Sequence, residues 1–334
     1  MPPVDRHAPR RADSSESTYS LVEFMREFPD DTACLEHLWR ARYAPDGEHT
    51  TCPKCKQERV FRKYPTAQGR QSWTCTGCGH HVHPTAGTIF AKSSTSLHLW
   101  FYAMYLVTST RCGASAKQLE RSLGVSYRTA WRMLNKIRNE EIRNEVMADD
   151  GELLRGDIEA DETSVDGKPR KPHGKNTQIA IGPSRRSEAM KLRERSRATV
   201  FAAVERGGRV KATVLPSRRG PRLKETLIEW VEPESIIVTD EWPSYNGLDK
   251  HFISHSRINH SAGMYVEGDT YTNTIEGFFG HLKPSLRGTY RKVSHCWLQG
   301  YLNEFTWRYN LRYQRDPSMF AELVARSVQP KVTS

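Results

Sequence analysis

The chain has 334 residues, of which 50 are Lys or Arg and 39 are Asp or Glu, so its net charge at pH 7 is +11. Its hydrophobic content of 37% is sufficient for a folded chain and excludes global disorder. The longest apolar run, residues 99–107, is too short for a membrane-spanning helix, which needs roughly 20 residues. The basic excess favours a polyanionic partner, and nucleic acid is the first candidate.

The N-terminal segment, residues 1–18, is polar and rich in Pro and Ser. Because it lacks the apolar centre of a secretory signal, we expect a disordered arm. Residues 19–45 follow as a helical lead-in, in which Leu35, Leu38 and Trp39 have the spacing of one helix face. We expect no association with a membrane.

Residues 46–92 contain two Cys-x-x-Cys pairs, Cys52 with Cys55 and Cys75 with Cys78, which nineteen residues separate. Each pair fits a tight turn that directs two thiolates to one position, and two such turns complete the tetrahedral sulfur shell that Zn²⁺ prefers. The short β-like stretches between the pairs are typical of a zinc ribbon. One Zn²⁺ ion in a closed four-thiolate shell would be structural. Four reduced thiols without a metal are the alternative.

Residues 93–145 carry a helix-turn-helix pattern. Ser115 and Ser126 are typical N-caps of two helices, and Gly124 lies at the turn between them. The second helix has one apolar stripe and an opposite polar face, which is how such a motif presents a helix to a DNA major groove. The residues predicted to contact DNA are Tyr127, Arg128, Arg132, Asn135 and Lys136. A helical hairpin with a solvated basic face is the alternative, and Glu120 stands where these motifs usually place a small residue.

The pattern changes near residue 150, and strands mixed with helices predict an α/β domain over residues 150–315. A basic stretch, residues 166–197, follows the first strand. Such a stretch is most often a solvated loop, and next to an active site it could contact a DNA backbone. Residues 316–334 are interpreted as a C-terminal tail.

Three carboxylates in this domain are not placed like ordinary surface charges. Asp161 and Asp240 each end an apolar strand, and Glu276 lies on a helix, seven residues before Lys283. Two helical turns put Glu276 and Lys283 on one face. Converging carboxylates repel one another unless cations bind, and two Mg²⁺ ions about 3.5–4 Å apart can hold the attacking and leaving oxygens of a phosphoryl transfer. Lys283 would contact a phosphate. The alternative is that these are strand-end caps and a surface Glu at accidental spacing.

This set of residues resembles the DDE motif of transposases and retroviral-type integrases. It consists of Asp161, Asp240 and Glu276, with thirty-five residues between the last two, and Lys283 follows it. Further stretches are similar to one bacterial group, insertion-sequence family fifteen-ninety-five. These stretches are residues 28–36, 85–90, 129–134, 160–163, 238–242, 259–261 and 273–278. The resemblance covers residues 21–312.

The resemblance implies an RNase H-like catalytic domain that holds two Mg²⁺ or Mn²⁺ ions through Asp161, Asp240 and Glu276. Zinc-ribbon and helix-turn-helix modules would precede it and recognise terminal inverted repeats. It further implies a cytoplasmic bacterial transposase that acts on double-stranded DNA as a homo-oligomer. Metal-activated water would cut the element's ends, and the freed 3′-hydroxyls would attack target DNA. Ser164 and Asp166 depart from the aromatic residue and the glycine that relatives tend to carry.

Three further acids flank the triad, and we interpret them as neighbours rather than ligands: Glu159, Glu162 and Glu241. His260 could approach the site. Two other functions remain open on the residues. One is a non-enzymatic DNA-binding regulator built on the ribbon and the helix-turn-helix, and binding of Mg²⁺ or Mn²⁺ would separate it from the transposase. The other is an RNase H-like nuclease without strand transfer, which would cleave DNA without joining ends.

Overall fold

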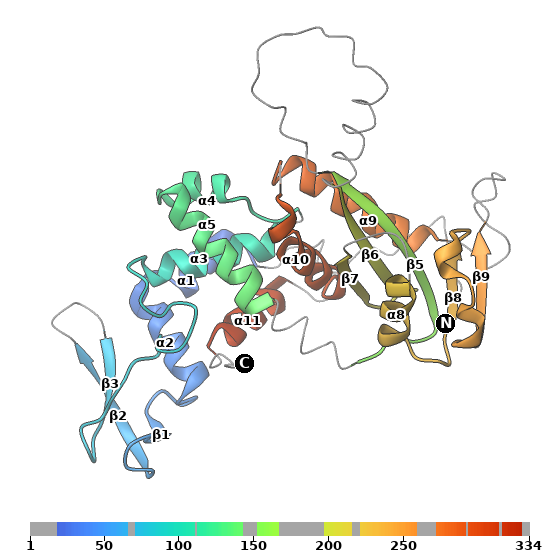
Figure 1. Cartoon of the computed structure of the whole chain (residues 1–334). Helices are drawn as coiled ribbons and strands as arrows, with labels where there is room; N and C mark the ends of the chain where they lie inside the picture. The colour runs from blue at the N-terminus through green and yellow to red at the C-terminus, as the bar shows by residue number, and fades with distance from the viewer. Residues whose placement is uncertain are drawn as a thin grey trace, which may run out of the picture. The chain divides into compact units, whose positions relative to one another are not determined.

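The computed structural model describes residues 19–65, 71–110, 112–142, 152–166, 197–215, 221–258, 272–291, 293–313 and 316–328. The chain divides into two compact units (Figure 1): residues 1–142 with 311–334 form unit 1, and residues 143–310 form unit 2. The expected arm and residues 167–196 of the basic stretch lie outside the described residues. Among the residues that are described, no helix is long and apolar enough to cross a membrane.

Unit 1 begins with helices α1 (Leu21–Glu27) and α2 (Asp31–Arg42). A capping box starts α1, because the Ser20 hydroxyl accepts from the Glu23 amide while the Glu23 carboxylate accepts from the Ser20 amide. At the start of α2, the Asp30 carboxylate accepts a hydrogen bond from the Ala33 amide at 2.8 Å. Both helix starts are therefore set by neighbouring residues of the sequence.

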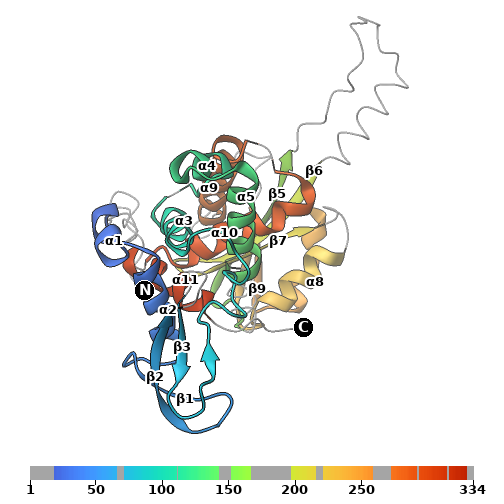
Figure 2. The ribbon, with the colours of Figure 1, turned by 90° about the vertical axis from the view of Figure 1, so that its left-hand side faces the viewer.

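A small antiparallel sheet follows, with strands in the order β1 (His49–Thr51), β2 (Glu58–Pro65), β3 (Gln71–Cys75) and β4 (His81–Val82). It packs on α2 through stacked indoles, with the ring centroids of Trp39 and Trp73 4.9 Å apart and their planes 11° from parallel. The Trp39 Nε1–H donates to the Gly47 carbonyl at 2.8 Å. Figures 1 and 2 both show this sheet beside the C-terminal end of α2.

The remaining elements of unit 1 are helical, namely α3 (Leu97–Ser109), α4 (Ala116–Leu123), α5 (Tyr127–Lys136), the π-helical turn η2 (Ile137–Ile142) and α11 (Asp316–Ser327). As predicted, Ser115 and Ser126 cap α4 and α5 through their hydroxyls. Gly124 between them has a φ of 65°, a left-handed conformation that favours glycine. The Glu120 carboxylate on α4 pairs with Lys117.

Helix α11 differs from the tail expected at residues 316–334. Its apolar residues recur every three to four positions and are buried in unit 1: Met319, Phe320, Leu323 and Val324. The Phe320 ring packs edge-on against Phe24 and Phe28, with centroids 5.8 Å away in each case. The 3.6-residue period of the apolar side chains gives this helix a face that the core of unit 1 covers.

Unit 2 contains a five-stranded sheet in the order β7-β6-β5-β8-β9. The strands are β5 (Asp157–Asp166), β6 (Arg197–Glu205), β7 (Val210–Leu215), β8 (Ile236–Asp240) and β9 (Ser254–Ile258). Strands β5, β6 and β7 are antiparallel neighbours, whereas β8 runs parallel to β5 and to β9. The register pairs Glu159 with Val238. Two residues further along both strands, Asp161 and Asp240 are therefore neighbours. Asp240 ends β8 as predicted, but the prediction that Asp161 ends a strand is wrong, because pairing with β6 continues β5 to Asp166.

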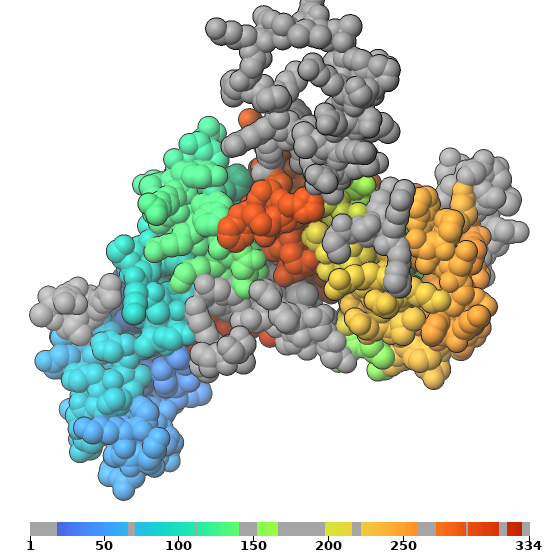
Figure 3. Space-filling view, viewed as in Figure 1, coloured from blue at the N-terminus to red at the C-terminus, as the bar shows by residue number. Residues whose placement is uncertain are grey.

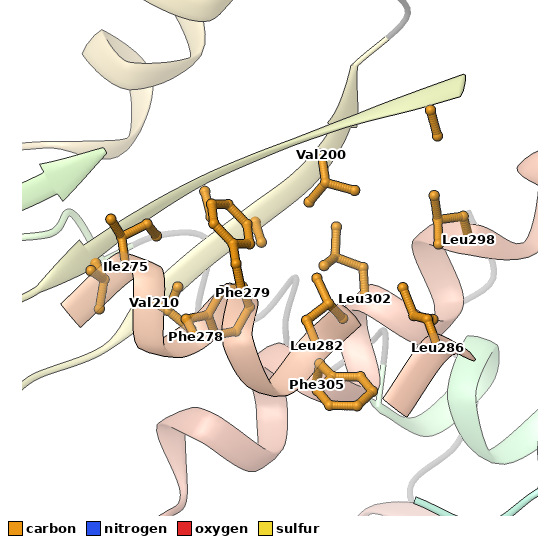
Figure 4. Packing of buried hydrophobic residues seen from close by; sticks show 14 residues of the cluster. Val200, Val210, Ile275, Phe278, Phe279, Leu282, Leu286, Leu298, Leu302 and Phe305 are labelled. Carbon is orange, nitrogen blue, oxygen red and sulfur yellow. The ribbon is translucent and has the colours of Figure 1, made fainter. Parts of the chain in front are cut away.

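Helices cover both faces of this sheet. The helices are α8 (Pro221–Trp230), α9 (Asn273–Gly288) and α10 (Leu298–Asn310), and short turns are η3 (Pro243–Tyr245), η4 (Leu248–Lys250) and η6 (His295–Trp297). Helix α8 packs on the face that presents Ile158, Ala160 and Phe201, and Figures 1 and 2 show it opposite α9. Side chains of α9 and α10 pack against Val200 and Val210 on the other face (Figure 4). This layered arrangement confirms the expected mixed α/β domain.

Candidate metal centres

The four cysteines predicted to bind zinc lie together in unit 1. Ligand atoms of Cys52, Cys55, Cys75 and Cys78 are all within 4.8 Å of one another. Cys52 and Cys75 are buried, Cys55 and Cys78 are half-buried, and all four are free thiols. This donor set is the one that structural zinc sites use, and one ion fits among the four sulfur atoms. The cluster could therefore bind zinc.

Two turns of the same design hold these thiols. In the first, the Lys56 amide donates to the Cys52 carbonyl at 2.9 Å, and the Cys52 amide donates to the Gln57 carbonyl at 2.9 Å. In the second, Gly79 and His80 make the same two bonds to Cys75, at 3.0 and 2.9 Å. The fourth residue after each first cysteine has a positive φ, 57° at Lys56 and 71° at Gly79. The strained Lys56 conformation is one in which glycine would be more favourable.

The first turn also supplies charge stabilisation. Burial raises the pKa of the Cys52 thiol, but hydrogen bonds from the Cys55 and Lys54 amides and from neighbouring thiols outweigh it and lower this pKa. The His80 amide lowers the pKa of Cys78, but burial and hydrogen bonds with the other three thiols outweigh it and raise that pKa. The turn therefore favours the thiolate at Cys52, and the thiolate is the form that binds metal.

The second cluster consists of carboxylates in unit 2. Oxygen atoms of Asp161, Glu162 and Asp240 lie within 4.8 Å of one another. Burial, followed by the charges of Glu162 and Asp240, raises the pKa of Asp161 to about 7, although the Lys283 ammonium opposes the shift. Carboxylates that repel one another in this way are ligands whose repulsion a hard cation relieves. This donor set fits Mg²⁺ or Mn²⁺.

Glu162 belongs to this cluster, although its position in the sequence predicted only a neighbour of the triad. It follows Asp161 directly on β5, so its side chain leaves the opposite face of the sheet. There the Tyr245 hydroxyl, which is fully buried, donates to Glu162 Oε2 at 2.6 Å. The alternation of a strand separates the two side chains, so no spacing in the sequence indicated that their carboxylates approach each other.

Glu276 and Lys283, the other two predicted catalytic residues, lie on α9. Glu276 is exposed on the first turn, where the Thr272 hydroxyl donates to its Oε1 at 3.1 Å. It is not part of the group formed by Asp161 and its two neighbours. Lys283 is half-buried, with its Nζ 5.7 Å from the centre of the Phe279 ring, and it lowers the pKa of Asp161 through its charge. His260 lies outside the described residues, and Glu241 is exposed.

The predicted DNA-contact residues do not all share one environment. Three are exposed on α5, whose surface is green in Figure 3: Tyr127, Arg128 and Arg132. The Asn135 amide oxygen instead accepts from Asn139 Nδ2 at 2.7 Å. The Lys136 ammonium donates to the Ile89 carbonyl at 3.1 Å. The last two residues therefore make contacts within unit 1, while the first three face solvent.

Comparison with known proteins places this geometry in context. Residues 153–310 match the family of the ISXO2-like transposase domain. The "Uncharacterized protein in transposable element ISH50" of Halobacterium salinarum is 27% identical over 262 residues, which are 77% of this chain and 84% of that relative. The "Uncharacterized transposase-like protein" of Haemophilus influenzae is 35% identical over 102 residues, 30% of this chain and 81% of that relative.

Two solved structures are distant matches. The "Crystal structure of the Mos1 Strand Transfer Complex" aligns with 66% of this chain and 75% of its own, at 12% identity and a TM-score of 0.24. The "Crystal structure of a pre-cleavage Mos1 transpososome" aligns with 66% and 76%, at a TM-score of 0.17.

The family match spans the five strands of unit 2 and α8, α9 and α10. The Haemophilus influenzae relative is matched over four-fifths of its length at an identity above 30%. Together these findings confirm the resemblance drawn from the motifs. The chain belongs to the ISXO2-like transposases of insertion-sequence family fifteen-ninety-five.

Proposed function

We propose that this protein cleaves DNA at the ends of an insertion sequence and joins the freed ends to target DNA, with divalent metal ions bound in unit 2. One observation carries this proposal. Asp161 and Asp240 come from strands far apart in the sequence, yet they meet in one cluster where the pKa of Asp161 is raised to about 7. Burial and the neighbouring carboxylates both disfavour the charged form of Asp161, and a bound cation offsets both effects.

In unit 2, three carboxylates would bind the metal ions and one lysine would contact the DNA. Asp161 would hold the ions from the middle of β5 and Asp240 from the end of β8, and Glu276 would complete the ligand set from the first turn of α9. Bound Mg²⁺ or Mn²⁺ supplies Lewis-acid activation of the phosphodiester and of the attacking oxygen. Lys283 would contact a phosphate near the scissile bond. Its charge acts on the metal site, because it lowers the pKa of Asp161. Water or a 3′-hydroxyl attacks, so no Ser or Tyr nucleophile is needed.

The arrangement of the sheet supports an RNase H-like fold for this unit. Three antiparallel strands, β5 to β7, are extended by two strands parallel to β5, in the order β7-β6-β5-β8-β9. The central strand β5 carries Asp161, and its parallel neighbour β8 carries Asp240 at its end. This topology supplies a rigid framework on which two ligands are held by backbone hydrogen bonds.

Unit 1 would bind the terminal inverted repeats. Its four-thiolate cluster would hold one structural Zn²⁺, and the exposed side chains of Tyr127, Arg128 and Arg132 would contact DNA from α5. Arg side chains are suited to phosphate oxygens and to guanine edges in a major groove. A homo-oligomer that pairs two element ends is part of this proposal.

The decisive experiment uses end-labelled DNA that carries the inverted repeats flanking the gene. Wild-type protein, Asp240→Asn and the matched control Asp249→Asn, an exposed Asp of unit 2, are compared with Mg²⁺, Mn²⁺ or chelator. We expect metal-dependent cleavage and joined products from wild type and from the control. Asp240→Asn should lower cleavage more than about 100-fold, beyond what loss of an outer-shell partner costs.

Each of the other outcomes would indicate a different site or a different function. Cleavage by Asp240→Asn at the wild-type rate would contradict the assigned site. Cleavage without joined products would indicate a nuclease, and specific binding without cleavage by folded wild type would indicate a regulator.

A further inference from the structure

Glu159 is a buried carboxylate of unit 2 that the proposed chemistry does not use. It lies on β5 two residues before Asp161, and its exposed fraction is 0%. A carboxylate out of contact with water is strongly unfavourable unless donors satisfy both of its oxygens. The hydrogen-bond partners of Glu159 therefore show how its carboxylate is stabilised in the core.

Four donors surround the Glu159 carboxylate. Oε2 accepts from the backbone amides of Thr274 at 2.8 Å and Ile275 at 3.0 Å. Oε1 accepts from the Thr274 hydroxyl at 2.9 Å and from Arg206 Nε at 2.9 Å. Two of the four donors are backbone amides from the first turn of α9, and a third comes from a side chain on that turn.

These bonds make Glu159 the cap of α9, although 115 residues separate it from Thr274. The residue at the helix's own N-cap position, Thr272, makes no side-chain cap bond. Its hydroxyl donates instead to Glu276 Oε1 at 3.1 Å. A carboxylate at a helix N-terminus also interacts favourably with the helix dipole. The long-range cap thus leaves the local hydroxyl available for Glu276.

The same bonds tie the two elements that carry the proposed ligands. Glu159 and Asp161 leave the same face of β5 because side chains alternate along a strand. Glu276 directly follows Ile275, whose amide Glu159 binds. The atoms that these hydrogen bonds join are therefore only a few covalent bonds away from the carboxylates of Asp161 and Glu276.

We propose that Glu159 is a positioning residue of the metal centre. Its carboxylate holds the first turn of α9 against β5 and so places Glu276 for the ions that Asp161 and Asp240 bind. This inference rests on the proposed function in one respect, that Glu276 is a ligand. Arg206 supplies the opposite charge that a buried carboxylate needs.

A double-mutant cycle on the full-length protein tests the proposal, with Mn²⁺ affinity measured by calorimetry in the absence of DNA. We expect Glu159→Gln to weaken Mn²⁺ binding about 10- to 100-fold, as loss of an outer-shell partner does. Glu276→Gln should weaken it at least as much. The double variant should bind no more weakly than Glu276→Gln alone, because Glu159 acts only through Glu276.

Two further variants separate positioning from general stability. Glu304→Gln alters another fully buried carboxylate of unit 2, which accepts from Arg308 and Tyr290, and should leave Mn²⁺ affinity within about twofold. Thr274→Val removes only the hydroxyl donor and provides a folded test should Glu159→Gln unfold. Hydrogen exchange at the Thr274 and Ile275 amides should accelerate in Glu159→Gln and Thr274→Val but not in Glu304→Gln.

The outcomes distinguish this inference from the proposed function. If Glu276→Gln weakens Mn²⁺ binding while Glu159→Gln and Thr274→Val do not, the positioning role is overturned and the metal site stands. An additional loss from Glu159→Gln in the Glu276→Gln background also overturns it, since Glu159 would then act through another group. If wild type does not bind Mn²⁺, the proposed function fails and the positioning role fails with it.

Discussion

The two candidate metal centres of this chain are assembled in opposite ways. The four thiols of unit 1 lie between Cys52 and Cys78, on two turns with the same hydrogen bonds. The carboxylates of unit 2 come from β5 and β8, which only the order of the sheet brings together. The first centre is thus a product of local turns, and the second is a product of topology.

The surrounding cores differ in the same sense. The hydrophobic cluster under the small sheet includes Cys52 and Cys75 themselves, beside Trp39 and Trp73. The sheet of unit 2 has a separate apolar core on each face, and Figure 4 shows the one under α9 and α10. We infer that metal is part of the stability of the first region and part of the function of the second.

Removal of zinc should give the largest effect. A chelator, or Cys75→Ser, should unfold the small sheet, because binding of a structural Zn²⁺ contributes on the order of 10 kcal/mol to folding. Limited proteolysis should then cut within residues 46–92 while the described strands and helices of unit 2 stay protected. Cys112→Ser, at an exposed cysteine of unit 1, is the control and should behave like wild type. Equal loss of both regions would remove the contrast between the two centres.

The pH dependence of the metal-free protein should be smaller and should come from unit 2. The pKa of Asp161 in the folded chain, about 7, lies above its ordinary value of 3.8, so the folded state binds this proton more tightly than the unfolded state does. Its contribution to the free energy of unfolding is therefore present below pH 4 and is lost as the pH rises through 7. Asp161→Asn should remove this dependence, an effect of a few kcal/mol at most, on the order of 1.4 per pKa unit.

Denaturant titrations of wild type and Asp161→Asn at pH 5 and pH 8 measure this difference. The variant should gain relative stability at pH 8, and Mg²⁺ should reduce the gain because it stabilises the wild-type carboxylates. A difference that is the same at both pH values would show that burial and the neighbouring carboxylates do not raise the pKa of Asp161 in the folded chain.

Lys283→Gln should have the smallest effect. Without its ammonium, which opposes the raised pKa of Asp161, Mn²⁺ should bind slightly more tightly because a positive charge has been removed. Cleavage should weaken by about tenfold or less, in line with one partly solvated ion pair. The slope of the logarithm of DNA affinity against the logarithm of salt concentration should decrease by about 1, which corresponds to the loss of one phosphate contact. Weaker Mn²⁺ binding in this variant would contradict the placement of Lys283 near the carboxylates.

Patterns of short range could be predicted from the sequence. Ser115 and Ser126 cap their helices as expected, because a cap is a bond between residues three positions apart. The thiol cluster follows from the spacing within each Cys-x-x-Cys pair. The meeting of Asp161 and Asp240 was predicted from two apolar strands together with the family resemblance, although Asp161 lies within β5 and not at its end.

Other contacts of long range could not be predicted. Glu162 joins the acidic cluster from the opposite sheet face, and Glu159 caps a helix that starts more than a hundred residues later. Lys136 looked available for DNA, but its ammonium donates to the Ile89 carbonyl. Each case depends on the element that packs opposite the side chain. Residue type and spacing do not specify that element.

The sequence by itself thus determined the local turns, the helix starts, the candidate ligand types and the family of this protein. Only the tertiary structure decided that Glu162 shares a site with Asp161 and Asp240 and that Glu159 caps α9. The physical reason is the range of the interactions. Caps and cysteine turns are closed by hydrogen bonds within five residues, whereas the acidic cluster and the Glu159 clamp exist because parallel pairing of β5 with β8 and packing of α9 bring distant charges together.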